Sequence, residues 1–337
     1  MKKKAQATNT KKIPNTSEKI LGFIEDRNQA TGHELADFLD ITTRAVRKQL
    51  SNLVEKNRIY KVGRSPKVFY LLRDQRSDVD IHEQVDSKTR IIIDANFMNI
   101  TPAGEKQEGF EGFVNWCHKR KDPVEKTARE YVATIKKYSL YKKDGLIEGM
   151  YKMKKTFPKD VALDALFYLD FYSIERFGKT KLGQLLLYAK QSQSKSLIKE
   201  LVTQIRPQIE SMIKNRKVDA VGFIPPTVKR EVQLMKEIEK QLHLSVAIIP
   251  ITKIKTPVMV PQKTLNKLED RIENAKKTIF VEGSKKFKTV LLIDDALGSG
   301  ATLNETAKKL KSQKMADTII GLAITGSFSG FEVISEV

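Results

Sequence analysis

Two adjacent aspartates stand directly before a loop of small residues near the end of the chain. The segment reads VLLIDDALGSGATL, residues 290–303, with the acids at Asp294 and Asp295. The apolar run before them is typical of a buried strand, and the residues after the loop can begin a helix. Because ligands of parallel α/β sheets bind at the carboxyl ends of strands, we expect the two carboxylates to face a ligand.

The loop that follows, residues 296–302, has the chemistry of an anion site. Gly298 and Gly300 allow positive φ and a close approach of a ligand to the backbone. Several N–H groups can therefore point toward one phosphate, assisted by the N-terminus of the next helix. The hydroxyls of Ser299 and Thr302 can add donors. Carboxylates repel phosphate but suit sugar hydroxyls, so the segment predicts a site for a sugar phosphate.

Other ligands for such a loop fit less well. A nucleotide-binding P-loop requires a lysine after the last glycine, and Ala301 stands there instead. A dinucleotide fingerprint requires a third glycine where Leu303 stands. An acid pocket of the receiver or haloacid type can use the two aspartates but leaves the loop without a role. A solvated turn with incidental acids stays open as the non-functional alternative.

The surrounding sequence predicts the sheet that carries this loop. Strands are expected at VDAVGFIPP, SVAIIPI, TVLLID and TIIGLAIT. Helices are expected at TVKREVQLMKEIEKQLHL and at about residues 301–311. Alternating strands and helices predict an α/β fold with a largely parallel sheet covered on its faces.

The first 73 residues predict a different, α+β unit. Residues 1–16 are Lys-rich without an apolar period, which indicates a disordered arm. Three helical segments follow: SEKILGFIEDRN, TGHELADFLDI with a capping box at Thr31 and Glu34, and TTRAVRKQLSNLVEKN. RIYKV and KVFYLL then read as two strands around the turn GRSP. This order predicts a winged helix-turn-helix over residues 17–73.

The third helix of this unit predicts a nucleic-acid interface. Its outer side carries Thr43, Arg44, Arg47, Lys48, Ser51 and Asn52, and the hairpin tip adds Arg64 and Lys67. These residue types contact phosphates and base edges in a major groove. The net charge of +20, with sixteen Lys and Arg against seven Asp and Glu in residues 1–73, favours a polyanionic partner. We expect double-stranded DNA and a homodimer, with protein docking as the alternative.

The rest of the chain gives fewer signals. Residues 74–89 read as a linker, and residues 90–178 as an α-rich middle region without an assigned role. Its first segment, RIIIDANFMNITPAGEKQEGFEGFVNWCHKRK, suggests a strand, a Pro-Ala-Gly turn and a helix. The single cysteine, Cys117, excludes an internal disulfide and a cysteine-based zinc cluster. No apolar run reaches the roughly 18–20 residues that cross a bilayer. No secretory signal is evident, so we expect a cytoplasmic protein without a membrane partner.

Several segments bear a family resemblance. LLIDDALGSGAT resembles the phosphoribosyl-pyrophosphate (PRPP) signature of type I phosphoribosyltransferases. GFIPPTVKREVQLMKEIEKQL and PQKTLNKLEDRIENAKKTIFV resemble further segments of the ComF-like competence proteins of this fold. TKLGQLLLYAKQSQSKSLIKEL is similar to their upstream Lys-containing helix. The likeness covers about residues 179–326, and it predicts a phosphoribosyltransferase-like domain over residues 179–337.

The resemblance implies PRPP as the ligand and gives each residue a role. Asp294 and Asp295 would hold the ribose hydroxyls and, indirectly, Mg²⁺. The 5′-phosphate would lie on the backbone and hydroxyls of Ala296, Leu297, Gly298, Ser299, Gly300, Ala301 and Thr302. The pyrophosphate side would comprise Pro225, Pro226, Lys229, Arg230 and Arg271, and Asn274 matches an asparagine of the same family segment. Zinc is not expected.

Two departures from the family bear on activity. Gly298 stands where relatives usually carry Thr or Ser, or an Asp that is a proton partner for a purine. Few residues follow the last strand, which leaves little chain for a base-recognising hood. A winged helix before such a domain resembles the architecture of purine repressors. The sequence therefore favours a DNA-binding regulator that senses PRPP, with an active phosphoribosyltransferase or a competence-type DNA-handling factor as alternatives.

Overall fold

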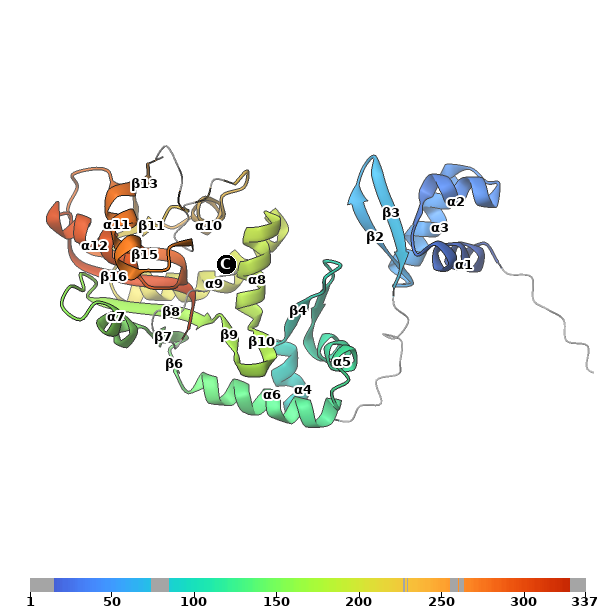
Figure 1. Cartoon of the computed structure of the whole chain (residues 1–337), viewed down its shortest axis with the longest axis horizontal. Helices are drawn as coiled ribbons and strands as arrows, with labels where there is room; N and C mark the ends of the chain where they lie inside the picture. The colour runs from blue at the N-terminus through green and yellow to red at the C-terminus, as the bar shows by residue number, and fades with distance from the viewer. Residues whose placement is uncertain are drawn as a thin grey trace, which may run out of the picture. The chain divides into compact units, whose positions relative to one another are not determined.

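The computed structural model describes residues 15–73, 85–226, 228, 230–254, 260 and 264–327. The chain divides into two compact units, Met1–His82 and Glu83–Val337, and each is described by itself (Figure 1). Most of the predicted basic arm and of the predicted linker lies outside the described residues. No helix within the described ranges is long and apolar enough to cross a membrane.

The first unit contains three helices and a small antiparallel sheet with the strand order β1-β3-β2. Its elements are α1 (Thr16–Arg27), β1 (Ala30–Thr31), α2 (Gly32–Leu39), α3 (Thr43–Glu55), β2 (Ile59–Arg64) and β3 (Lys67–Leu72). The predicted capping box at Thr31 and Glu34 is confirmed at the start of α2. Ile20, Leu35 and Leu50 are fully or almost fully buried and bring the three helices around one core.

The second unit is built from a larger set of elements. Its first part comprises α4 (Ser87–Asn96), β4 (Met98–Ile100), β5 (Lys106–Glu108), α5 (Gly109–Arg120), α6 (Val124–Ser139), β6 (Lys142–Lys143), β7 (Leu146–Glu148), α7 (Met150–Thr156), β8 (Ala165–Phe171), β9 (Ser173–Ile174), the 3₁₀ helix η2 (Glu175–Phe177) and β10 (Gly178–Lys179). Its second part comprises α8 (Lys181–Ser192), α9 (Lys195–Asn215), β11 (Ala220–Phe223), α10 (Leu234–Leu242), β12 (Ala247–Ile249), β13 (Ile251–Lys253), α11 (Leu268–Thr278), β14 (Ile279–Val281), β15 (Phe287–Leu297), α12 (Ala301–Ser312) and β16 (Ala316–Gly326).

A seven-stranded sheet with the order β12-β11-β15-β16-β8-β7-β6 forms the centre of this unit. The strands from β12 to β8 are parallel, and the β6–β7 hairpin adds an antiparallel edge. The predicted α/β class with a mostly parallel sheet is therefore confirmed. Three of the strands, β6, β7 and β8, come from the middle region.

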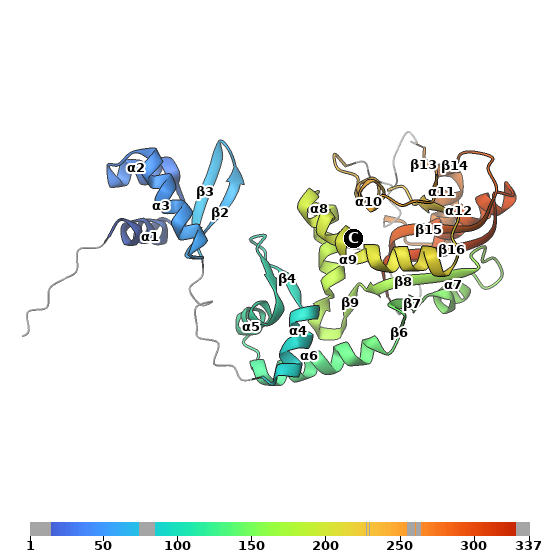
Figure 2. The same ribbon diagram turned by 180° about the vertical axis from the view of Figure 1, so that it is seen from behind.

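Helices cover both faces of this sheet, as expected for parallel strands. Along β15 the buried side chains alternate: Val290 and Leu292 join one core, and Leu291 and Ile293 join the other. The second core is closed by α8, α9 and α10, which Figure 2 shows from the side where α9 crosses the sheet. The first core is closed by α5, α6, α7 and α12.

The strand, turn and helix predicted from RIIIDANFMNITPAG onward are present as β4, the residues after it and α5, but the strand is short and RIIID at the start of the segment lies in helix α4. The side chain of Asp86 caps the helix by accepting from the Thr89 N–H at 3.0 Å. Thr89 and Ile93, four residues apart, are buried, whereas Ile91 between them is 66% exposed. Burial with a period of four positions is helical, and a run of branched apolar residues does not reveal that period by itself.

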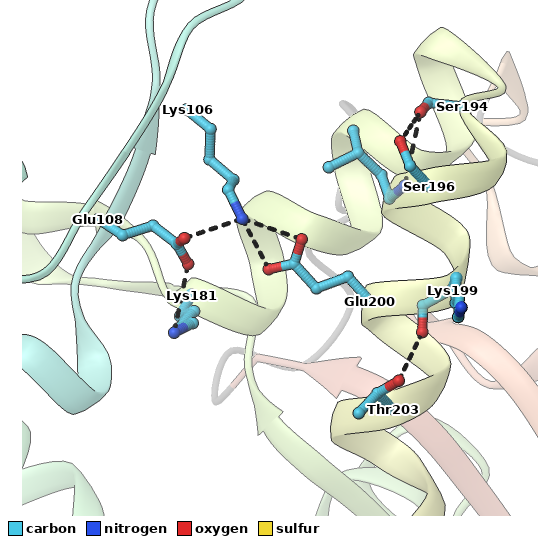
Figure 3. Close-up of polar contacts among 9 residues, drawn as sticks. Lys106, Glu108, Lys181, Ser194, Ser196, Lys199, Glu200 and Thr203 are labelled. Carbon is cyan, nitrogen blue, oxygen red and sulfur yellow. Dashed lines mark hydrogen bonds and ion pairs between the residues drawn. The ribbon is translucent and has the colours of Figure 1, made fainter. Parts of the chain in front are cut away.

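The β4–β5 hairpin of the middle region is fixed to the helices of the second core. Met98 and Ile100 of β4 pack into that core. On β5, Lys106 Nζ lies 2.8 Å from a carboxylate oxygen of Glu108 and 3.0 Å from one of Glu200 on α9 (Figure 3). Glu108 in turn lies 3.4 Å from Lys181 Nζ at the start of α8. The middle region is thus continuous with the sheet domain in both packing and charge.

Candidate functional site

The acid pair lies where two parallel strands of the sheet separate. Phe223 of β11 pairs with Ile293 of β15, and the next amide, Ile224 N–H, donates to the Ile293 carbonyl at 2.8 Å. Pairing with β11 ends there, whereas β15 continues beside β16 as far as Leu297. Asp294 and Asp295 therefore stand at the carboxyl end of the β11–β15 pair, the position where ligands bind in parallel sheets.

The Asp295 carboxylate forms an ion pair with a lysine from another element, and the Asp294 carboxylate lies within electrostatic range of two lysines. Lys190 Nζ, on the last turn of α8, lies 2.5 Å from Asp295 Oδ2. Lys253, on β13, interacts with the Asp294 carboxylate and lies 3.1 Å from Asn274 Oδ1. The Asp295 N–H donates to Asp294 Oδ1 at 2.8 Å, which fixes the orientation of the first carboxyl group.

Burial shifts the charge state of this group of side chains. Burial, with the negative charge of Asp295 second, raises the pKa of Asp294. Burial also lowers the pKa of Lys253 to about 8, although the nearby Asp294 favours its charged form. Shifts of this kind gather at functional sites, because a ligand or proton supplies the missing partner there.

The loop after the acids is shorter than the sequence predicts. Ala296 and Leu297, which the sequence assigns to the loop, still belong to β15, so only residues 298–300 lie between the strand and α12. The side chains of Leu297 and Ala301 are each 1% exposed and pack into the first core. Their side chains are therefore structural, and a ligand can meet these two residues only through the backbone.

The geometry of the loop fits an anion in part. Gly300 has φ 77° and is the N-cap of α12, so the helix N-terminus opens at this point. Two amides are used inside the loop: Gly298 N–H donates to the Ala296 carbonyl at 3.1 Å, and Ala301 N–H to Ser299 Oγ at 3.3 Å. Thr302 follows in the first turn of the helix.

Arg271 on α11 lies against this loop. Its side chain is buried, and a β-carbon built on Gly298 would lie 4.0 Å from Arg271 Nη1. Its Nε donates to the Leu265 carbonyl at 2.7 Å, and burial lowers the pKa of Arg271. The structure thus places Arg271 next to the segment assigned to the 5′-phosphate, whereas the sequence assigns it to the pyrophosphate side.

A pocket of about 720 Å³ opens beside the acid pair, a volume in the range of small-molecule sites. Pro225, Pro226 and Arg230, which the family resemblance assigns to the pyrophosphate side, line it, and Lys229 lies outside the described residues. Lys253 and Asn274 line it as well and connect it to the acid pair. Further cations of the wall come from α9 and α10, namely Lys195 and Lys236.

The C-terminal end of α8 connects the pocket with the acids. The guanidinium of Arg230 donates to the Lys190 carbonyl, and Val232 N–H donates to Gln193 Oε1 at 2.8 Å. The sequence indicates the helix that carries Lys190, but no pattern in it singles out Lys190, Lys253 or Gln193. A lysine at a helix end is common, so only the contact with Asp295 identifies this one.

In the first unit, the residues predicted to contact DNA share one face. All six on α3, from Thr43 to Asn52, are exposed, whereas Val46, Leu50 and Leu53 are buried on the opposite side. Lys67 at the hairpin is exposed too. The side chain of Arg64 lies outside the described part of the chain.

The donor set of the acid pair fits magnesium that arrives with phosphate. Among the described residues, no group of three or more His, Cys, Asp or Glu side chains could hold a metal ion. Two carboxylates with further oxygens from phosphates are a usual environment for Mg²⁺. Cys117 is buried in the first core and does not belong to this donor set.

One family model matches the part of the chain that contains this site. Residues 191–326 match the family model of the phosphoribosyl transferase domain. Two crystal forms of a hypoxanthine phosphoribosyltransferase from Staphylococcus aureus, tetragonal and orthorhombic, are 16% and 15% identical over 40% of this chain and 69% of theirs, with TM-scores of 0.25 and 0.27. A hypoxanthine-guanine phosphoribosyltransferase from Bacillus anthracis is 14% identical over 42% of this chain and 73% of its own, with a TM-score of 0.28.

No curated protein matches the chain. The family match includes the acid pair, the loop and the pocket. The C-terminal part of the chain, residues 191–326, therefore carries a phosphoribosyltransferase domain.

Proposed function

We propose that this domain binds PRPP and that the chain is a DNA-binding regulator whose DNA-bound state responds to that ligand. One observation carries the proposal: the acid pair, the Gly298–Gly300 loop and the cationic pocket meet at one edge of the sheet. Each has the chemistry for a different part of PRPP, namely the diol, the 5′-phosphate and the pyrophosphate.

In this assignment Asp294 and Asp295 accept hydrogen bonds from the ribose hydroxyls. The amides at the start of α12, with Arg271 beside them, bind the 5′-phosphate. Arg230 and Lys253 contribute positive charge around the pyrophosphate. The two aspartates are the side chains that would hold Mg²⁺ together with oxygens of the ligand, and the ion would supply positive charge that offsets the charge of the phosphates.

Two features favour sensing over transfer. Gly298 has no side chain with which to exchange a proton with an acceptor. The first unit has the element order of a winged helix-turn-helix and presents a basic face on α3. We propose that this face binds double-stranded DNA, as a homodimer, because one such unit reads only a short half-site.

The test is calorimetric titration of PRPP with Mg²⁺ into the full chain. We expect saturable binding that weakens at least tenfold, about 1.4 kcal/mol, in Asp294→Asn/Asp295→Asn. Glu269→Gln/Asp270→Asn is the matched control, since it removes two adjacent, exposed acids elsewhere in the same domain and should bind as the wild type does. Absence of PRPP binding in the wild type would refute the proposal.

An active phosphoribosyltransferase is the second candidate, and the size of the pocket favours it. At about 720 Å³ the pocket can hold more than a pyrophosphate group, which leaves room for an acceptor. An acceptor base is added to the calorimeter cell after the PRPP titration, and the pyrophosphate released is measured. This measurement distinguishes a PRPP sensor from an active phosphoribosyltransferase. Release above the background of the aspartate variant would make the protein an enzyme.

A further inference from the structure

The Asp295 carboxylate, which we propose accepts a hydrogen bond from a ribose hydroxyl, already forms an ion pair with a side chain of the protein. Lys190 Nζ lies 2.5 Å from Asp295 Oδ2, and the two side chains are only 19% and 17% exposed. Little water screens the attraction at such a depth, so this pair is stronger than a surface ion pair. Because Lys190 occupies one oxygen of this carboxylate, a cation bound there is opposed by the ammonium group, and a diol shares the carboxylate with it.

Lys190 is also attached to the wall of the pocket through its own backbone. Its carbonyl accepts from the Arg230 guanidinium, and three residues later Gln193 Oε1 accepts from the Val232 N–H. Pro225, Pro226, Arg230 and Val232 all line the pocket. An anion that binds Arg230 in the pocket thus arrives next to the segment that carries Lys190.

Lys253 does not have this arrangement. Its ammonium group lies on Asn274 at 3.1 Å and faces the inner carboxylate, Asp294. It lies on the pocket wall itself. The short, half-buried ion pair with Asp295 is what makes Lys190 the candidate for an exchange of partners.

We propose that Lys190 is a positioning residue that exchanges partners when the ligand binds. In the unliganded domain its ammonium group neutralises the Asp295 carboxylate. When the diol of the ligand, or a cation bound with the ligand, interacts with Asp295, the ammonium group moves to the phosphate of the ligand. This inference rests on the proposed function for the identity of the ligand. Its consequence is a linked requirement: a divalent cation alone is opposed by Lys190, and a polyphosphate alone is opposed by Asp295. Only a ligand that brings both an anion and a diol or cation satisfies the site.

The first test uses Mn²⁺ alone, without any phosphate, and follows free Mn²⁺ by electron paramagnetic resonance. We expect weak binding to the wild type and at least about tenfold tighter binding to Lys190→Met, because close charge pairs of this kind are coupled by more than 1.4 kcal/mol. Lys199→Met, which removes the same charge from an exposed position of α9, should match the wild type. Lys190→Met/Asp295→Asn should lose the gain.

The second test measures the binding of metal-free inorganic pyrophosphate. Its first variant is Asp295→Asn, so the test does not require that the single variant Lys190→Met folds. Asp295→Asn releases Lys190, so pyrophosphate should bind it several-fold more tightly than it binds the wild type. If the gain in pyrophosphate affinity came only from removing the negative charge of Asp295, the double variant Asp295→Asn/Lys190→Met would show the same gain. If it comes from the release of Lys190, the double variant should gain much less affinity. An equal gain in both variants would overturn the proposal.

Unchanged Mn²⁺ binding in a folded Lys190→Met protein would overturn it as well. These outcomes are independent of the PRPP titration. Failure of PRPP to bind, with the Mn²⁺ gain present, would leave the Lys190–Asp295 exchange intact and refute only PRPP as its ligand. PRPP binding without the Mn²⁺ gain would refute the exchange alone.

Discussion

At the scale of single residues, the site is a set of charges that balance one another in the absence of a ligand. Asp295 forms an ion pair with Lys190 of α8, and the charges of Lys190 and of Lys253 on β13 both act on Asp294. Burial raises the pKa of Asp294 and lowers that of Lys253, so both groups are less charged than they would be in water. A charged ligand therefore alters the protonation of the site when it binds.

We predict that Lys253 titrates with a pKa of about 8 in the folded protein. Because this value lies below the unfolded one of 10.5, burying the charged amine costs stability at low pH, and the cost fades as the pH rises from about 8 to 10.5. Nuclear magnetic resonance of lysines labelled at Cε should show one signal titrating near pH 8. That signal should be missing from Lys253→Met and retained in Lys236→Met, which lies on the same pocket wall. Titration of Lys253 with the surface lysines would contradict this.

At the scale of elements, the site depends on the abrupt passage from β15 to α12. Three residues, 298–300, connect an eleven-residue strand with a twelve-residue helix. Gly300 makes this possible, because its φ of 77° is left-handed and a β-carbon at this position would overlap Met153 of α7. The position of the helix N-terminus relative to the acid pair is thereby fixed.

We predict that Gly300→Ala destabilises the second unit by about 2 kcal/mol or more. A left-handed conformation costs a non-glycine residue about 1–2 kcal/mol, and the added methyl group would overlap Met153 Sδ. Gly298→Ala is the matched control, since its φ is not positive and its new methyl group would come no closer than 4.0 Å to the atoms around it. Differential scanning calorimetry should show a clear loss for Gly300→Ala alone, and equal losses would contradict the explanation.

At the scale of the whole molecule, the chain combines two compact units with different surfaces. The first has a helix, α3, whose exposed face carries Arg44, Arg47 and Lys48. The second contains the phosphoribosyltransferase domain and takes three strands of its sheet from the middle region. A net charge of +20 over 337 residues is compatible with a polyanionic partner.

We predict that Arg47→Ala weakens binding to a labelled random-sequence DNA duplex and leaves PRPP binding unchanged. Loss of one phosphate contact should also lower the slope of log affinity against log salt concentration by about one. Fluorescence anisotropy at several salt concentrations measures both quantities. Arg27→Ala, at the end of α1, is the control and should retain the wild-type slope. Binding of DNA that is insensitive to Arg47, Arg44 and Lys48 would exclude α3 as the interface.

Much of this protein follows from local patterns in its sequence. The apolar run before Asp294 predicts β15, and the alternating strands and helices predict the parallel sheet, because strand and helix periods repeat within a few residues. The order of α1, α2, α3, β2 and β3 follows for the same reason. Local signals are less precise at boundaries: β15 extends through Ala296 and Leu297 because pairing with β16 continues, which no local pattern indicates.

Only the tertiary structure decided the partners within the site. Lys190 and Asp295 lie 105 positions apart, and the cations of the pocket come from α9, α10, β13 and the loop after β11. The same holds for RIIID, which is helical because α4 buries Thr89 and Ile93 against other elements. Residue types and spacing identify which groups can bind sugar and phosphate. Which charges face one another depends on packing between distant segments, and the periodicity of a single segment carries no information about that packing.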